Sequence, residues 1–268
     1  MKKTISILLF AIITVVCNAQ SQEYSFSEKY NVEALEELSI DLEDGDISVF
    51  SSNESDIRIN FIAKINKKLI KIDRVELEKH FSIEMKKSQN SIEIFSKPTQ
   101  KENNKKWSNR IILSLELIVP NTTSCNLNTV DGDIKVKDLQ ANQKCKTIDG
   151  SIYLLNIKGV VSVTTSDGDV KFSDIEGVFT ALSYDGNISG DLSVLKENLS
   201  LSTRDGDIEV TLPKGLGLNL DLRGDEIDTI FENFEGRIDD EYIIGKLNGG
   251  GIPVNISTRD GDLRLDFK

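Results

Sequence analysis

Pairs of carboxylates recur along this sequence at a spacing that could bind a metal ion or carry out acid–base chemistry. Asp131 and Asp133 stand two residues apart, and the same arrangement recurs from Asp167, Asp205 and Asp260. Calcium takes about six to eight oxygen ligands, and many glycoside hydrolases use two carboxyl groups as acid and base. A calcium site and a carbohydrate-active enzyme are therefore the two chemical hypotheses to weigh.

The distribution of these acids favours a structural role. Each leading Asp is followed by Gly, and the second acid is replaced by Ser151 and Asn187 in alternate copies, which lowers like-charge repulsion between stacked turns. A calcium site would gain ligands at these positions, and a catalytic pair would occur once in a cleft. We therefore predict a non-enzymatic protein with no catalytic residues, no metal site and no cofactor.

The other reactive residues give no stronger candidate. His80 is the only histidine and is interpreted as a solvated surface residue. Cys125 and Cys145 have no nearby histidine that would complete a zinc site, and they form either one disulfide or two buried thiols. The glycines at 249–251 are not followed by the Lys-Ser or Lys-Thr pair of a phosphate loop.

An exposed aromatic stripe could bind sugar rings or a protein partner. The candidates are Trp107, Tyr153, Phe172 and Tyr184. Counted from the nearest Asp-Gly pair, Tyr153 and Tyr184 are predicted to point outward and Phe172 inward. These aromatic residues therefore do not form one column.

The elements that must position these residues follow from an internal repeat. Asp-Gly occurs at Asp131 and recurs after 18, 18, 18 and 20 residues, with further copies at Asp260 and Asp44. Such a step is typical of the coil length of a solenoid. Gly would supply a positive φ at each turn, and Asp would bond the backbone two residues on.

Aligned on the Asp, the copies form columns of one residue class. The column four residues before the Asp is apolar and consists of Leu127, Cys145, Val163, Ala181, Leu201 and Ile256. The column two residues before it carries hydroxyls and consists of Thr129, Thr147, Thr165, Ser183, Thr203 and Thr258. The column three residues after it is aliphatic and consists of Ile134, Ile152, Val170, Ile188, Ile208 and Leu263. One coil cannot bury its own apolar face, whereas a stack can. The sequence therefore predicts an all-β fold, a single parallel β-solenoid with Asp-Gly turns and about 18-residue coils. Antiparallel hairpins, which Asp-Gly also suits, are the alternative.

Two parts of the chain depart from this regular step. Residues to about 119 form an irregular N-terminal third, in which 64–109 is charged and is predicted to hold edge strands and a mobile loop near 97–109. Regular coils follow over 120–212. Residues 213–252 are interpreted as an insertion, either a loop or a lateral strand pair, and 253–268 as the final coil. One β-solenoid domain is thus predicted over 20–268.

The first 19 residues predict a signal peptide. Lys2 and Lys3 precede an apolar run that is too short to span a membrane, and Ala19 offers a cleavage site. Acylation at Cys17 is the alternative, although the branched Val16 before it does not suit a lipoprotein peptidase. The protein is therefore expected to be exported, to the periplasm, the outer surface or the medium, with no transmembrane segment.

The chain is acidic, which excludes some partners. Its net charge of -12 becomes -14 once the two leader lysines are removed. A negative field repels phosphate backbones and anionic lipid, so we expect no nucleic-acid partner and regard a bare membrane as a poor partner.

Segments in the last third carry a family resemblance. The stretches 212–215, 245–251 and 256–263 resemble the putative-adhesin family of β-strand-repeat proteins, a domain of unknown function of the bacterial cell envelope, and 119–134 is similar to the entry into that family's repeat core. The resemblance implies a β-solenoid associated with the cell surface. It supplies no catalytic residues.

The function expected from these observations is binding. We predict a secreted or cell-surface, adhesin-like protein with a binding or scaffolding role, whose partner is a protein or glycan at the cell surface. An envelope-stress or sensing accessory protein that binds another envelope component is the first alternative, and a carbohydrate-active β-helix enzyme is the second.

Overall fold

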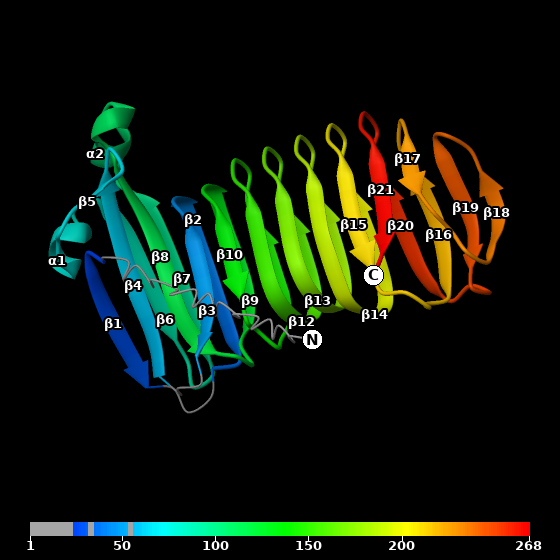
Figure 1. The fold of residues 1–268 in the computed structure, drawn as a ribbon. Helices are drawn as coiled ribbons and strands as arrows, with labels where there is room; N and C mark the ends of the chain where they lie inside the picture. The colour runs from blue at the N-terminus through cyan, green and yellow to red at the C-terminus, as the bar shows by residue number, and fades with distance from the viewer. Residues whose placement is uncertain (1–23, 32–34, 53–55) are drawn as a thin grey trace, which may run out of the picture.

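A computed structural model describes residues 24–31, 35–52 and 56–268 of the chain. The predicted signal peptide, 1–19, lies outside the described residues. Within them, 21 strands form one continuous, mostly parallel sheet, stacked side by side along a single axis (Figure 1). The prediction of an all-β fold is confirmed.

Seven strands form the regular centre of the stack. They are β9 (Ser124–Asp131), β10 (Ile134–Lys137), β11 (Gln143–Lys146), β12 (Ile152–Thr164), β13 (Val170–Leu182), β14 (Ile188–Ser202) and β15 (Ile208–Leu212). Ile134 lies in parallel register with Ile152, and Ile152 with Val170, so these coils follow one another at 18-residue steps. All three side chains are fully buried. The apolar columns of the sequence therefore form the core.

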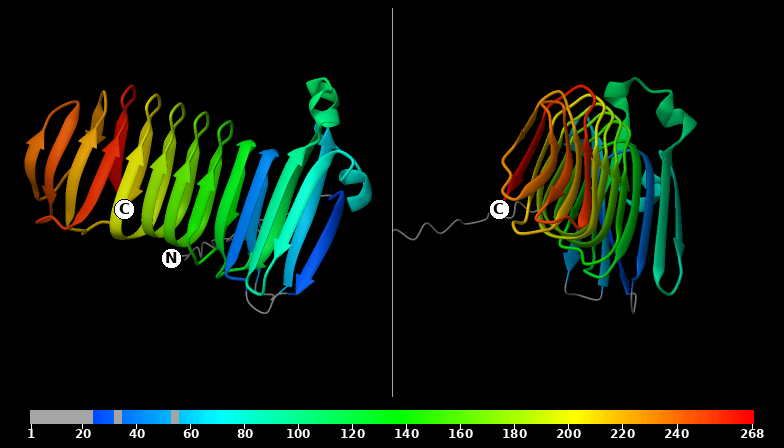
Figure 2. Two further views of the ribbon diagram at one scale, coloured as in Figure 1. Left: turned by 180° about the vertical axis from the view of Figure 1, so that it is seen from behind. Right: turned by 90° about the vertical axis from the view of Figure 1, so that its right-hand side faces the viewer.

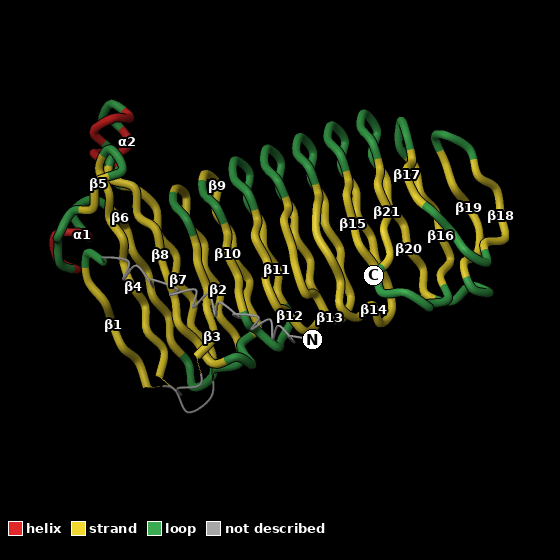
Figure 3. Tube along the Cα trace, in the orientation of Figure 1, coloured by secondary structure: helices red, strands yellow, loops and turns green. Residues whose placement is uncertain are grey.

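Each coil folds back at its Asp-Gly turn, which divides the sheet into two walls. We call the strand segments that lead into the turns the pre-turn wall and the segments that leave them the post-turn wall. The long strands β12, β13 and β14 begin in the post-turn wall and end in the pre-turn wall. The turns line up along one long edge (Figure 3), and successive coils superimpose when viewed along the axis (Figure 2, right). Alternate residues of each wall face the core or the outside.

The order of the coils in space differs from their order in the chain at the C-terminal end. The final coil consists of β20 (Ile252–Ser257) and β21 (Leu263–Phe267), which stack on β14 and β15. β16 (Leu218–Arg223) and β17 (Ile227–Thr229) stack on the outer side of this final coil, also in parallel. The interpretation of 213–252 as a loop or lateral strand pair is therefore corrected in part: residues 218–229 supply an outer rung of the stack, and residues 234–247 form an antiparallel strand pair.

The N-terminal end repeats this arrangement. The first coil consists of β2 (Glu37–Asp44) and β3 (Ile47–Ser52), which lie between the regular centre and a pair of outer strands. Those outer strands are β7 (Ser91–Pro98) and β8 (Ile111–Pro120). At both ends of the molecule, a coil from near the chain terminus is thus enclosed by a segment that lies nearer the middle of the sequence.

Antiparallel strands close both ends. β6 (Phe81–Lys87) pairs with β7, and β4 (Asp56–Ile65) pairs with β8, β1 (Phe26–Asn31) and β5 (Lys68–Leu69); β19 (Tyr242–Leu247) pairs with β16 and with β18 (Phe234–Ile238). Short helices α1 (Arg74–Leu77), α2 (Gln100–Asn103) and η1 (Trp107–Asn109) lie at the N-terminal end. The purely parallel solenoid of the prediction therefore holds for the interior and changes to antiparallel pairing at the ends. Among the described residues, no helix is long and apolar enough to cross a membrane.

Candidate functional site

The leading aspartates of the turns form a column along one edge. Backbone bridges join Asp131 to Asp149 and continue rung by rung to Asp260, and Asp44 lies in register with Asp131. Burial, followed by the neighbouring carboxylates, raises the pKa of Asp131 and of Asp44. Farther along the edge, the Arg204 guanidinium offsets this repulsion, because it lies 2.7 Å from the Asp185 carboxylate and 3.0 Å from that of Asp205.

The second acid of each turn has a structural partner. Its side-chain oxygen accepts a hydrogen bond from the backbone N–H of the equivalent residue on the next rung, at 2.8 to 3.2 Å. This chain of bonds links Asp46, Asp133, Ser151, Asp169, Asn187, Asp207 and Asp262. Ser and Asn replace Asp in alternate rungs without loss of the bond, because each supplies an acceptor oxygen. The position requires an acceptor rather than a charge.

The hydroxyl column links neighbouring rungs by hydrogen bonds on the core side of the turn. Each hydroxyl donates to the carbonyl oxygen of the turn glycine on the preceding rung, at 2.7 to 3.1 Å. The donors are Thr129, Thr147, Thr165, Ser183, Thr203 and Thr258. All six residues are buried. This bond satisfies a backbone acceptor that the strand ladder leaves free at the turn.

The turn glycines serve a purpose that the sequence reasoning missed. Left-handed φ values occur at Gly45 and Gly206, but not at Gly132, Gly150 or Gly168. A Cβ on any of six turn glycines would lie only 2.0 to 2.5 Å from the carbonyl oxygen of the turn glycine one rung away. These six are Gly132, Gly150, Gly168, Gly186, Gly206 and Gly261. The expectation that glycine supplies a positive φ is therefore corrected. Glycine is required mainly because neighbouring backbones approach closely.

These bonds explain why the repeated acids do not gather around a point. Within the described residues, no group of three or more His, Cys, Asp or Glu side chains is arranged to hold a metal ion. The predictions of no metal, no cofactor and no catalytic residue stay predictions. The second acid of each turn has an assigned structural role as the acceptor of the rung-to-rung hydrogen bond.

His80 contacts a buried carboxylate, which corrects its interpretation as a solvated residue. Its side chain is 19% exposed, and Nδ1 lies 2.7 Å from Oε2 of Glu102. Glu102, 1% exposed, also contacts the ammonium of Lys105 at 2.8 Å and accepts a hydrogen bond from the backbone N–H of Ile111. Burial alone would raise the pKa of Glu102, but these partners together lower it. The predicted loop at 97–109 therefore contains the end of β7 and the two short helices α2 and η1, and Glu102 links α2 to the start of β8.

Cys125 and Cys145 are free, buried thiols, which settles the alternative that the sequence left open. They point into the core from adjacent strands but from different register positions, because Cys145 pairs with Leu127 and Cys125 with Gln143. Burial raises the pKa of Cys145 to about 12 and also raises that of Cys125. Neither thiol is suited to nucleophilic chemistry.

The predicted orientations of the aromatic residues hold where the structure describes them. Phe172 is buried, Tyr184 is 48% exposed and Tyr153 is partly buried on the outer surface. The side chain of Trp107 lies outside the described ones. Phe172 fits because its register partner on the next rung is Gly190, where a Cβ would lie 2.7 Å from the Phe172 ring.

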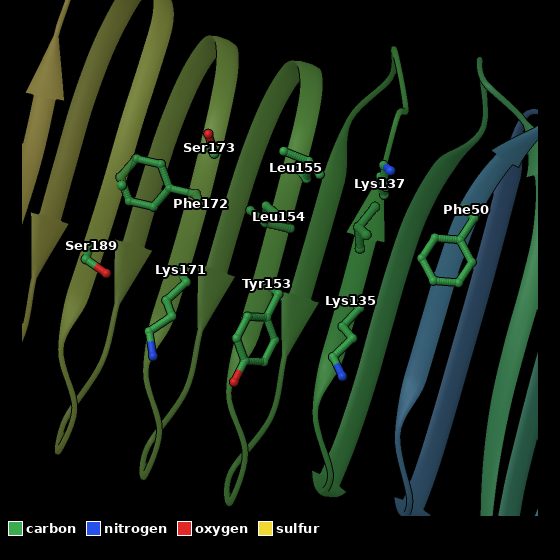
Figure 4. A pocket seen from close by; sticks show the side chains of 12 residues that line it. Phe50, Lys135, Lys137, Tyr153, Leu154, Leu155, Lys171, Phe172, Ser173 and Ser189 are labelled. Carbon is green, nitrogen blue, oxygen red and sulfur yellow. The ribbon is translucent and has the colours of Figure 1, made fainter. Parts of the chain in front are cut away.

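Tyr153 lies in a groove on the outer surface of the post-turn wall. The groove has a volume of ≈ 460 Å³ and crosses successive rungs from β3 to β14. Lys135, Tyr153 and Lys171 occupy the same register on adjacent strands and lie side by side, and Ser189 continues the column (Figure 4).

A second outward column two residues farther along each strand completes the groove. It runs from Phe50 through Lys137 and Leu155 to Ser173. Leu155 is 41% exposed, and Phe50 is partly buried. The groove thus combines an aromatic and aliphatic surface with three lysines, and its lining contains no carboxylate.

The three lysines make different contacts. The ammonium of Lys135 lies 5.4 Å from the centre of the Tyr153 ring, within cation–π range. Lys171 lies 2.9 Å from the Asp169 carboxylate and Lys137 lies 3.8 Å from that of Asp138, both at exposed positions beside the groove. Exposed ion pairs of this kind are weak and exchange readily.

Sequence reasoning found Tyr153 but not the lysines around it. The signal is present in the alignment of the repeats, where the position four residues after Asp reads Lys135, Tyr153 and Lys171 in consecutive copies. That position varies freely elsewhere, so it carries no repeat pattern that would mark it.

The fold and the groove define a β-solenoid-like stacked-sheet protein that presents a grooved outer wall. The chain belongs to the Toastrack DUF4097 family, whose model matches twice, over residues 35–177 and 120–266. The family predicted from the resemblance is confirmed. No curated protein matches the chain.

Two solved structures are similar over much of the chain. One is a putative cell adhesion protein from Clostridium sporogenes, with 17% identity and a TM-score of 0.40 over 91% of this chain and 99% of that one. The other is a putative adhesin from Bacteroides fragilis, with 15% identity and a TM-score of 0.33 over 72% of this chain and 98% of that one.

Proposed function

We propose that this protein is an exported, non-catalytic, adhesin-like protein that binds a glycan at the cell surface through the groove on its post-turn wall. The observation that carries the proposal is the Tyr153 ring, held in a groove between lysines on the neighbouring rungs. An aromatic ring with one polar end offers an apolar face to the C–H face of a sugar and a hydroxyl to its polar groups.

The shape of the groove supports a polymeric ligand. Its floor is built from five adjacent strands, β3, β10, β12, β13 and β14, so it runs along the stack axis and across the strands. The rigid parallel ladder fixes the spacing of the outward side chains without help from a ligand. Such preorganisation lowers the entropic cost of binding an extended chain.

The turns support binding without catalysis. Paired acids are the chemical groups that a carbohydrate-active enzyme would use. Here the second acid accepts the rung-to-rung backbone hydrogen bond, as Asp133 does from Ser151 and Asp169 does from Asn187. The turns also lie along the edge of the stack rather than in the lining of the groove.

The test is a glycan-binding assay with the mature chain from residue 20 onward. Immobilised polysaccharides are titrated with wild type, with Tyr153→Ala and with Tyr184→Ala, a matched control because Tyr184 is exposed outside the groove. We expect binding that Tyr153→Ala weakens and Tyr184→Ala leaves unchanged. Equal behaviour of the two variants, or release of reducing ends during incubation, would contradict the proposal.

A further inference from the structure

We infer that the groove selects an anionic polysaccharide, which lies along the stack axis with acidic groups over Lys135 and Lys171 and one sugar ring on Tyr153. This inference rests on the proposed function and names its ligand class. The alternation of cation, aromatic ring and cation on consecutive rungs carries it.

Register and spacing give this alternation its meaning. Adjacent strands of a sheet lie about 4.8 Å apart, so Lys135 and Lys171 stand roughly 10 Å apart with Tyr153 midway between them. The step between rungs is close to the length of one sugar unit in an extended polysaccharide. A chain laid across the strands therefore meets a cation, an aromatic face and a cation at successive sugar units.

Charge distinguishes an acidic ligand from a neutral one. The whole chain has a net charge of -12, yet the groove lining contains Lys135, Lys137 and Lys171 and no Asp or Glu. An anionic polymer is repelled by the rest of the surface, whereas at this wall its acidic groups can replace the exposed carboxylates of Asp169 and Asp138 as partners of Lys171 and Lys137. A neutral polymer can accept hydrogen bonds from the lysines but forms no ion pair with them.

The cationic stretch has a defined end. In the column of Lys135, Tyr153 and Lys171, the next residues are Ser189 and then Glu209, which returns the surface to negative charge. The lysines therefore span three rungs, and the ligand segment that contacts them is correspondingly short.

The experiment compares two forms of one polymer in calcium-free buffer. Polygalacturonate and its fully methyl-esterified form share the sugar ring and differ in charge, and dextran serves as an unrelated neutral polymer. The groove variant is Lys135→Gln with Lys171→Gln. The control is Lys144→Gln with Lys146→Gln, which removes two exposed lysines from β11 on the opposite wall.

We expect wild type to bind polygalacturonate more tightly than its methyl ester, with affinity falling as salt is added. The groove variant should bind polygalacturonate about tenfold more weakly, as loss of two exposed ion pairs predicts. The control variant should stay within about twofold of wild type, because long-range charge effects are screened at physiological salt.

The outcomes separate this inference from the proposed function. Equal binding of both polymer forms, with loss of both in Tyr153→Ala, would overturn the acidic ligand and leave glycan binding in place. No binding to polygalacturonate, its ester or dextran would overturn both. Equal weakening by the two double-lysine variants would show non-specific attraction and would also overturn the inference.

Discussion

Replacing Gly168 with Ala tests whether close approach of backbones, rather than a special φ, accounts for the repeated turn glycine. A Cβ on Gly168 would lie 2.1 Å from the carbonyl oxygen and 2.5 Å from the carbonyl carbon of Gly150. The oxygen contact is roughly 1 Å or more shorter than an ordinary non-bonded contact. Because both colliding atoms belong to the backbone, no side-chain rotation relieves the clash.

The magnitude follows from the bonds that a shift would disturb. Separating these rungs strains the Thr165 hydroxyl bond to Gly150 at 2.8 Å and the turn amide bonds, such as that from Gly150 to Asp167 at 3.0 Å. Overpacking costs about 1–3 kcal/mol, and each weakened hydrogen bond adds about 1 kcal/mol. We therefore expect Gly168→Ala to lower the free energy of unfolding by about 3 kcal/mol or more.

Gly215 provides the matched control, since the two glycines separate the two explanations. Gly215 has a left-handed φ of 79°, and nothing lies within 4 Å of a Cβ built on it. Gly215→Ala should therefore cost only the conformational penalty, about 1 kcal/mol. If φ were the reason for the turn glycines, Gly168→Ala would be neutral or slightly stabilising, because Ala restricts the unfolded chain.

Urea unfolding of the chain from residue 20 onward, followed by circular dichroism, measures both variants. Hydrogen exchange at the turn amides locates the effect, and we expect faster exchange at the rungs adjoining position 168. A free energy of unfolding for Gly168→Ala within about 0.5 kcal/mol of wild type would refute the close-approach explanation.

Three further predictions concern titratable groups. Thiol reagents at pH 8 should leave Cys125 and Cys145 unmodified until the chain is unfolded, because burial raises the pKa of both; rapid labelling of the native protein would contradict this. Because its pKa is lowered in the folded state, Glu102 contributes stability above its unfolded pKa and loses that contribution as pH falls through its folded pKa. The melting temperatures of wild type and Glu102→Gln should therefore converge in acid. A difference that stays constant with pH would contradict this prediction. The raised pKa of Asp131 means that its charged form destabilises the folded protein. Asp131→Asn should therefore stabilise the protein at pH 7 and lose this advantage below about pH 4. Millimolar calcium should leave the melting temperatures of wild type and Asp131→Asn unchanged.

The interior of the fold could be predicted from the sequence because its information is periodic. The columns before and after each Asp-Gly pair identify which residues face the core, and the 18-residue step gives their register, as in Ile134 beside Ile152. In a stack, each coil contacts only its neighbours, so local pattern and global fold coincide.

The order of coils at the ends could not be read in the same way. In space Leu263 lies between Ile208 and Ile227, because it pairs with one on each side. In the chain, however, Ile227 lies between Ile208 and Leu263. The apolar columns indicate that a segment forms a rung, but they do not indicate which other rung it contacts. Every rung offers a similar apolar surface to its neighbours. The antiparallel closing strands lack the Asp-Gly marker and protect edges that would otherwise pair with another chain.

The candidate site was hidden for a related reason. Positions that build the stack repeat, so they stand out, whereas outward positions are free to differ between coils. The repeated acids attracted a chemical interpretation, yet Asp133 and Asp169 are used in rung-to-rung hydrogen bonds. Tyr153 and Lys135 vary from their counterparts in other copies and lie in the groove. In a molecule built from repeats, a residue that the repeat does not require is where a specific ligand contact should be sought.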